Sequence, residues 1–340
     1  MKIEDGLRVE GIKGSLDQER KSVDPLTLQP CNSATHFPSK WPHRLAVVTA
    51  CATFPLLFIG GLVTSKGAGL AVPDWPTTFG YNMFLYPWSK MAGAIFYEHS
   101  HRLVASGVGL LTIFVAVAFW IREQRNWLRW LGIAALGLVI VQGVLGGLRV
   151  VLLQPTLAIV HACFAQAFFA LIVSLAIFTS AAWNEKPPAK PIAGGRLWRL
   201  CAITTGLIYV QGIFGAVLRH TGGRLDAHLF LAALVALHVV LLVVRIMRSH
   251  SEQPKLVRPA LTLGVLLFMQ LILGPASYFG KFTTMLRMPV DALVFLTTTH
   301  LVVGALMLVT GLLLTLRSFR LSASGTSLRK KEMLTEQYEF

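Results

Sequence analysis

Long apolar runs separated by short polar connections make up most of the chain. Three of these runs, 103–121, 131–148 and 229–244, contain no Asp, Glu, Lys or Arg. With their flanking residues they reach the ~20 residues that an α-helix needs to cross the ~30 Å hydrocarbon core of a bilayer. Since a backbone in lipid must satisfy its hydrogen bonds within the segment, helices are the natural spanning element. The pattern predicts an all-α membrane protein.

The apolar pattern predicts eight transmembrane helices. They cover about 43–64, 99–121, 129–150, 156–181, 198–219, 227–247, 258–279 and 292–316. The chain then divides into a disordered cytoplasmic tail 1–42, a four-helix unit 43–184 with a long outer loop 65–97, a second four-helix unit 198–316 and a cytoplasmic tail 317–340.

The second unit repeats the first. The segment "HRLVAS" from His101 aligns with "HLFLAA" from His228, and "HACFAQAFFALIV" from His161 aligns with "HLVVGALMLVTGL" from His300. We therefore expect two pseudo-symmetric four-helix bundles. A Gln-x-x-x-Gly pattern also recurs near the ends of the odd spans, at Gln142/Gly146, Gln211/Gly215 and Gln270/Gly274. Such glycines allow either close helix packing or the approach of a flat cofactor, and the pattern leaves both open.

The distribution of charge indicates membrane topology rather than nucleic-acid binding. The formal net charge is +15, but most Lys and Arg lie in the tails and in the connections 122–129, 185–199 and 245–258. This distribution follows the positive-inside rule, and no basic stripe with interleaved aromatic residues is present. Both termini are therefore expected in the cytoplasm. The acidic residues of the N-terminal tail fit neither a transit peptide nor a signal peptide, which favours a bacterial inner membrane.

Paired histidines provide the candidate chemistry. Each unit has two equivalent histidines at the outer ends of its second and fourth helices, His101 with His161 and His228 with His300. Two neutral imidazoles facing each other across a helix bundle suit axial ligation of a haem iron. The chain's four cysteines form no C-x-x-C pair, so zinc clusters and covalent c-type haem lack support. His238, nearer the middle of its helix, is an alternative to His228.

A carboxylate accompanies only the first histidine pair. Glu98 precedes His101 by three residues, so both lie on one face of a helix. The equivalent position in the second unit is Leu225. Glu98 is either an acid–base group beside the iron or the partner of Arg102 in an i,i+4 salt bridge. The asymmetry predicts a reaction site in the first unit and an electron-relay haem in the second.

These motifs resemble those of the haem A synthase family. The resemblance is carried by "GGLVTSKGAGLAVPDWP", by the E-x-x-H-R run at Glu98–Arg102, by "QGVLGGLRV" followed by His161, and by "QGIFGAVLRHTG". It covers about residues 43–316. It implies a membrane oxidoreductase that oxidises the C8 methyl of haem O, its substrate, to a formyl group. The product is haem A, which is used in cytochrome oxidase assembly.

The resemblance also implies roles for individual residues. His101 and His161 would hold the substrate haem, His228 and His300 would hold a haem b that supplies electrons, and Glu98 would be the catalytic carboxylate. Many bacterial members carry cysteine pairs in the outer loops, and this chain has none there. Cationic side chains at predicted outer ends are candidates for binding haem propionates: Arg102, Arg149, Arg219 and His220.

The expected partners follow from the same resemblance. They are a haem O synthase, an electron donor such as a ferredoxin or a quinol, and membrane lipid; a homo-oligomer is compatible with the sequence, and no nucleic acid is expected. Two other functions remain open. A di-haem b electron-transfer cytochrome would share the four histidines without needing Glu98. A transporter would share the duplicated halves but leave the histidines unexplained.

Overall fold

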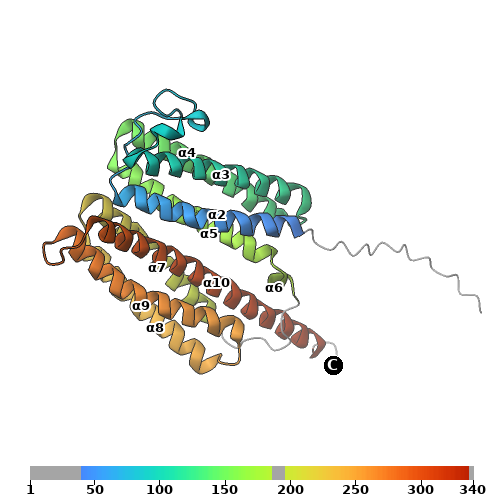
Figure 1. Ribbon diagram of the computed structural model, residues 1–340. Helices are drawn as coiled ribbons and strands as arrows, with labels where there is room; N and C mark the ends of the chain where they lie inside the picture. The colour runs from blue at the N-terminus through green and yellow to red at the C-terminus, as the bar shows by residue number, and fades with distance from the viewer. Residues whose placement is uncertain (1–39, 186–195, 337–340) are drawn as a thin grey trace, which may run out of the picture. The chain divides into compact units, whose positions relative to one another are not determined.

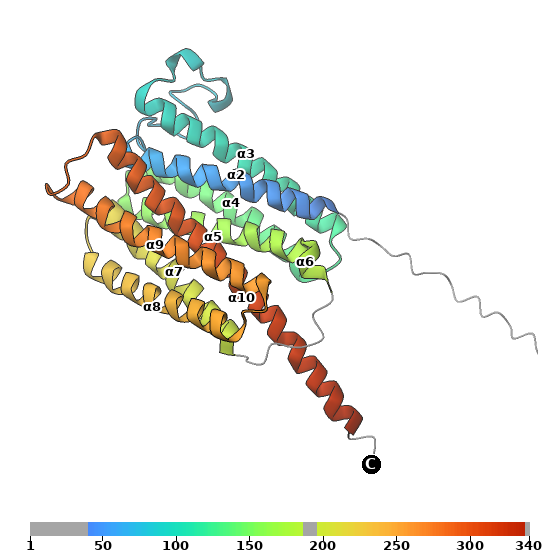
Figure 2. The same ribbon diagram turned by 60° about the horizontal axis from the view of Figure 1, so that its bottom comes forward.

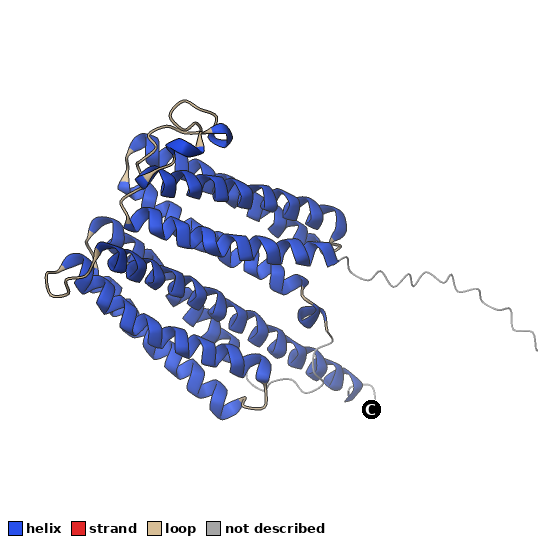
Figure 3. Ribbon diagram, viewed as in Figure 1, coloured by secondary structure: helices blue, strands red, loops and turns tan. Residues whose placement is uncertain are grey.

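The computed structural model describes residues 40–185 and 196–336, with side chains as far as residue 322 apart from that of residue 196. The predicted tail 1–42 lies outside the described residues except for its last three, which open the first helix. Within the described part the chain is helical and has no strand, only an isolated bridge between Thr78 and Tyr81 (Figure 3).

Eight of the described helices are long and apolar enough to span a membrane, which confirms the predicted all-α membrane fold. They are α2 (Lys40–Ser65), α3 (Gly93–Arg122), α4 (Asn126–Leu152), α5 (Pro155–Thr179), α7 (Arg196–Thr221), α8 (Leu225–Ser249), α9 (Pro254–Phe282) and α10 (Val290–Glu336). The shorter elements are the 3-10 turns η1 (Met83–Leu85) and η2 (Trp88–Lys90) and the helix α6 (Ala181–Asn184).

The helices pack as two groups of four. In the first group α2 contacts α3, α3 contacts α4, α4 contacts α5, and α5 returns to α2. The second group closes in the same order, α7 to α8, α9, α10 and back to α7 (Figure 1). Each group has its own apolar core, and a small cluster of Leu57, Phe169 and Ala305 joins them where α2 and α5 meet α10.

Two helices extend beyond the predicted spans. The second predicted span, α3, begins at Gly93 rather than near residue 99, so Glu98 lies inside the helix and not at its start. The last helix, α10, continues to Glu336, although residues 317–340 were expected to form a tail (Figure 2). Residues 317–336 contain no proline and are rich in Leu, Arg, Lys, Glu and Met, which favour helix even outside an apolar span.

The segment between α2 and α3 is the longest connection within the described ranges. In both views it lies beside the first turns of α3, on the side of the first group that is remote from the second (Figures 1 and 2). We call residues 66–92 the cap loop, and the end of the helices next to it the loop end. Because successive helices run in opposite directions, the loop end contains the C-termini of α2, α4, α7 and α9 and the N-termini of their successors.

A glycine substitution tests the packing of the first group. A Cβ atom at Gly132 of α4 would lie 3.1 Å from Cβ of Phe119 and 3.7 Å from the α3 backbone at Ala116. We expect Gly132→Val to destabilise the protein by about 1–3 kcal/mol through overpacking. Gly137→Val is the matched control, because nothing lies within 4 Å of a Cβ there. Equal falls of the thermal midpoint of the two variants in one detergent would contradict this packing.

Candidate functional site

Each predicted histidine ligand packs its ring on a glycine of the preceding helix. The four glycines lie at the loop end of α2, α4, α7 and α9, and the histidines lie on α3, α5, α8 and α10. A Cβ atom would be 3.1 Å from the ring Cε1 at Gly60/His101, 3.3 Å at Gly146/His161, 3.2 Å at Gly215/His228 and 3.3 Å at Gly274/His300. Since any larger residue would push the imidazole, the glycines set where the rings lie.

The four rings also share an electrostatic environment. The Nδ1 atoms of His101, His161, His228 and His300 are buried and have no hydrogen-bond partner among the described residues. His161 acts electrostatically on His101, and His228 acts on His300, so each predicted pair is brought together inside one helix group. Two pairs of buried imidazoles, one pair in each helix group, are residues that would hold a haem iron.

His238 has a different environment from the other four. Its Nδ1 lies 2.9 Å from the carbonyl oxygen of Leu234, one turn earlier in its own helix. It does not contact a glycine of a neighbouring helix in the way that His228 contacts Gly215. The shared packing supports His228 as the ligand, and the role itself remains a prediction.

Glu98 is a buried, fully engaged carboxylate. Its side chain is on α3, one turn before His101, and the residue is only 4% exposed. One oxygen, Oε2, accepts a hydrogen bond from the backbone N–H of Val72 in the cap loop at 3.0 Å. The other, Oε1, accepts one from Arg102 at 3.0 Å. The i,i+4 salt bridge considered from the sequence is therefore present, and it includes the cap loop.

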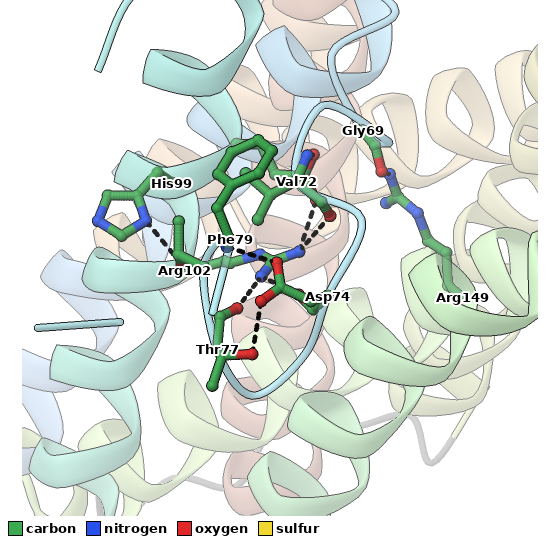
Figure 4. A network of polar contacts seen from close by, with 10 residues as sticks. Gly69, Val72, Asp74, Thr77, Phe79, His99, Arg102 and Arg149 are labelled. Carbon is green, nitrogen blue, oxygen red and sulfur yellow. Dashed lines mark hydrogen bonds and ion pairs between the residues drawn. The ribbon is translucent and has the colours of Figure 1, made fainter. Parts of the chain in front are cut away.

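Arg102 fastens the cap loop to α3. Its guanidinium donates to the carbonyl oxygens of Asp74 at 2.7 Å, Thr77 at 3.1 Å and Val72 at 3.0 Å, as well as to Glu98. Figure 4 shows this side chain reaching from the helix into the centre of the loop. These contacts make Arg102 a loop anchor, and its predicted role in binding a propionate gains no support from them.

Further contacts hold the cap loop from α3 and α4. His99 is two residues from His101 and so faces the opposite side of the helix; its Nδ1 lies 3.2 Å from Oγ1 of Thr78. Arg149 of α4 donates to the carbonyl oxygen of Gly69 at 2.9 Å (Figure 4). Trp75 packs on Gly147, where even a Cβ atom would lie 2.2 Å from the indole ring.

Asp74 shapes the turn that Arg102 contacts. Its carboxylate accepts hydrogen bonds from the backbone N–H groups of Phe79 at 2.7 Å and Gly80 at 2.9 Å, and from the hydroxyl of Thr77. Burial acts to raise the pKa of Asp74, but these donors favour the charged form and hold its pKa below the usual value of 3.8. The turn is thus stabilised only while Asp74 is ionised.

Cationic side chains gather at the loop end where the two helix groups meet. Arg219 of α7 donates to the carbonyl oxygen of Gly61 at 2.8 Å and to Ser65 at 2.6 Å. His220 lies in the field of Arg219, Arg149 and Lys281. Among the described residues none of these three cations forms an ion pair with a carboxylate. The cluster is suited to binding an anion, and the propionate-binding roles of Arg149, Arg219 and His220 remain predictions.

Sequence reasoning named the four histidines, Glu98, Arg149, Arg219 and His220 as candidates, and it missed several of their partners. The glycines at 60 and 61 were noted at the end of the first span, but Gly60 was not matched to His101 because α2 has no Gln-x-x-x-Gly pattern. Lys281 was missed because it follows the last apolar turn of α9, where a lysine is ordinary. No pattern in the sequence indicated that the Val72 N–H would bind Glu98.

Comparisons with known proteins identify the family of the chain. Residues 43–228 match the model of a family described as cytochrome oxidase assembly protein, a range that includes Glu98 and three of the four histidines. A heme A synthase of Shouchella clausii is 32% identical over 188 residues, which are 54% of this chain and 60% of that protein. A heme A synthase of Alkalihalophilus pseudofirmus is 28% identical over 184 residues, 53% of this chain and 60% of the relative.

A third relative gives a similar picture. The heme A synthase of Symbiobacterium thermophilum is 31% identical over 179 residues, 49% of this chain and 55% of that protein. The chain thus spans less than two thirds of the length of each of these curated relatives. The second helix group beyond His228 lies outside the family match, so its assignment rests on the internal repeat and on the packing of its histidines.

Substitution of Arg102 tests its anchoring of the cap loop. We expect Arg102→Lys to loosen the loop, because one ammonium cannot replace a planar guanidinium that contacts three carbonyls and Glu98. Loss of charge-assisted hydrogen bonds worth about 1.5–3 kcal/mol each corresponds to at least a ~10-fold faster tryptic cleavage after the exposed Lys90. Arg224→Lys, at an exposed arginine of the same end, is the control. Equal cleavage rates in the two variants would refute the anchor.

The loop should also respond to acid through Asp74. Its folded-state pKa is depressed, so the stabilisation is present above pH ~4 and is lost as the pH falls through the folded pKa. Hydrogen exchange at the amides of Phe79 and Gly80, corrected for intrinsic rates, should stay constant from pH 7 to 5 and accelerate below pH 4. In Asp74→Asn exchange should be fast throughout. A mutant profile identical to that of the wild type would show that the carboxylate does not hold the turn.

Proposed function

Because this chain belongs to the family of cytochrome oxidase assembly proteins, we propose that it is a haem A synthase. It takes haem O as substrate and oxidises the C8 methyl group to a formyl group, giving haem A. His101 and His161 hold the iron of the substrate. His228 and His300 hold a resident haem b.

The observation that carries this proposal is that two similar histidine pairs differ in one feature, a nearby buried carboxylate. All four rings pack on glycines in the same way, which supports two haem sites. Only the first pair has a buried carboxylate one turn away, since the position equivalent to Glu98 is Leu225. A protein that only relayed electrons would need no carboxylate at either site. The curated relatives named heme A synthase support the same conclusion.

The oxidation proceeds at a carbon of the substrate. Two successive hydroxylations convert the methyl group to a gem-diol, which loses one water to leave the formyl group. Each hydroxylation replaces a C–H bond by a C–O bond and removes two electrons from the carbon, which an external oxidant of the dioxygen class accepts. When bound between His228 and His300, haem b supplies reversible one-electron transfer for this chemistry. The protein's own residues orient the substrate, exclude water from the site and handle the protons.

Glu98 is the residue placed to handle charge. Its carboxylate accepts hydrogen bonds from the Arg102 guanidinium and the Val72 N–H, and it lies on the helix face of His101. A carboxylate held there stabilises positive charge that develops at the methyl carbon, or accepts a proton from attacking water. The cap loop contributes through Val72, since closing the loop completes the hydrogen bonding of the catalytic carboxylate.

The cationic cluster orients the haem groups through their propionates. Arg149, Arg219, His220 and Lys281 lie at the loop end, where the arginines and the lysine form no ion pair with a described carboxylate. Carboxylates of bound haem would provide the missing negative charge. Arg102 is left out of this role because its donors already hold the cap loop.

The proposal extends to location and partners. We place the protein in a bacterial inner membrane with both termini in the cytoplasm, because Lys and Arg are concentrated in the connections at the end of the bundle opposite the cap loop. A haem O synthase delivers the substrate, and a ferredoxin or a quinol supplies electrons. Membrane lipid surrounds the eight spans, and a homo-oligomer is compatible with this arrangement.

A di-haem b electron-transfer cytochrome is the second candidate. It is favoured by one observation, the salt bridge between Glu98 and Arg102, which gives the carboxylate a structural role without catalysis. Both candidates predict two low-spin haem signals, so spectra alone do not separate them. The formation of haem A separates them, because only the synthase makes it.

Co-expression with a haem O synthase, in a host that lacks haem A, tests the proposal. Chromatography of extracted haems should show haem A or its hydroxylated precursor from the wild type. In Glu98→Gln product formation should fall at least ~100-fold, because general acid–base groups contribute about 10²–10⁴-fold. Glu123→Gln is the matched control, since Glu123 is also ion-paired but lies at the opposite end of α3.

The outcomes separate the two functions. Haem A from the wild type and from Glu123→Gln, with haem O accumulating in Glu98→Gln, supports the synthase. Haem b alone in all three proteins, with a normal bis-histidine spectrum, would overturn the synthase in favour of the electron-transfer cytochrome.

A further inference from the structure

The three glutamines of the Gln-x-x-x-Gly pattern contact the same histidines whose rings pack against the glycines. Nε2 of Gln142 donates to the backbone carbonyl oxygen of His161 at 3.1 Å. The equivalent Nε2 of Gln270 donates to the carbonyl oxygen of His300 at 2.9 Å. In each case the glycine of one helix packs against the histidine ring, and the glutamine four residues earlier binds the histidine main chain. We call this combined contact of glycine and glutamine with one histidine the grip.

The third glutamine holds its histidine at a different atom. Nε2 of Gln211 lies 3.5 Å from Nε2 of the His228 ring. The amide again lies one helical turn before the glycine on which the ring packs, here Gly215. All three amides thus reach across from the glycine helix to the histidine helix.

Unpaired polar atoms are left on both sides of these contacts. Oε1 of Gln142, Gln211 and Gln270 is buried and accepts no hydrogen bond from the described residues. The Nδ1 atoms of the three facing histidines are unpaired as well. A metal-ligating histidine nearly always donates its second ring nitrogen to an acceptor, which fixes the tautomer and the ring orientation. In this structure the glutamine contacts are made through Nε2, to the main chain of His161 and His300 and to the ring of His228, and each Oε1 remains an unused acceptor on the same side chain.

His101 lacks this grip. Four residues before its glycine, Gly60, the chain has Leu56 in place of a glutamine. The ring still packs on the glycine at 3.1 Å, but no amide of α2 is available to its main chain or to its Nδ1. Of the four proposed ligands, His101 alone is positioned by a glycine without a glutamine.

We propose that Gln142, Gln211 and Gln270 are positioning residues for His161, His228 and His300, and that His101 is the exchangeable axial ligand. The proposal rests on the assignment of the four histidines as haem ligands. In the second group both ligands are gripped, which suits a haem that stays bound. The first group has one gripped and one ungripped ligand, which suits a substrate that must enter and leave.

Haem release from the purified protein tests the proposal without measuring catalysis. The protein is loaded with haem b alone, and transfer of haem to excess apomyoglobin is followed by absorbance. We expect two phases in the wild type, with the fast phase absent in His101→Ala. Loss of an outer-shell partner typically costs 10–100-fold in metal affinity. Gln270→Leu should therefore accelerate the slow phase by about 10–100-fold.

The converse variant adds the missing amide. Leu56→Gln should slow the fast phase at least ~10-fold, since it gives His101 the grip of the other three ligands. Leu56→Met is its matched control, similar in length but without an amide. Gln166→Leu is the control for the glutamine deletions, because Gln166 also has a buried, unpaired Oε1 but is followed four residues later by Ala170 rather than glycine.

Each outcome decides the proposal. Slower release in Leu56→Gln than in Leu56→Met, and faster release in Gln270→Leu than in Gln166→Leu, support it. Equal rates within either pair of variants would overturn it, provided that the low-spin spectrum shows bound haem at the start. Failure of the synthase proposal looks different, because haem A would then be absent while both release phases and their responses to the variants persisted.

Discussion

The close packing of an imidazole on a glycine is the contact on which the rest of this structure depends. A ring in van der Waals contact with a helix backbone requires a residue without a side chain and a fixed distance between two helices. Repetition of that contact in four successive helix hairpins sets their depth and rotation at the loop end. Each hairpin then brings one histidine to the centre of its group of four, and two hairpins make a facing pair.

The first helix group adds a second layer of polar contacts that the other lacks. The ion pair between Glu98 and Arg102 is buried, where breaking one partner leaves an uncompensated charge and is costly. Because the same two side chains bind main-chain groups at Val72, Asp74 and Thr77, the carboxylate and the cap loop are held together. The loop thereby becomes part of the first site, and its placement depends on the hydrogen bonds of Glu98 and Arg102.

Much of this arrangement is readable in the sequence because membrane helices follow simple rules. Apolar runs predicted all eight spans, and the aligned histidines predicted two pairs of rings, each within one helix group. The rest depends on tertiary contacts that have no local pattern. Val72 reaches Glu98 only through the path of an irregular loop, and the glutamine contacts become visible only once neighbouring helices are placed side by side. The end of α10 was missed because apolar periodicity marks spans and not polar helix beyond them.

Duplication followed by local change explains how one architecture can serve two purposes. A site that retains a cofactor gains from rigid ligands, since an imidazole already fixed in its rotamer and orientation binds the metal more tightly. A site that turns over a bulky substrate needs the opposite in at least one ligand, because product affinity limits release. The first group differs in both respects, because it has Leu56 at the place of Gln211 and Glu98 at the place of Leu225. On this view, two changes in a repeated hairpin convert a binding site into a reaction site.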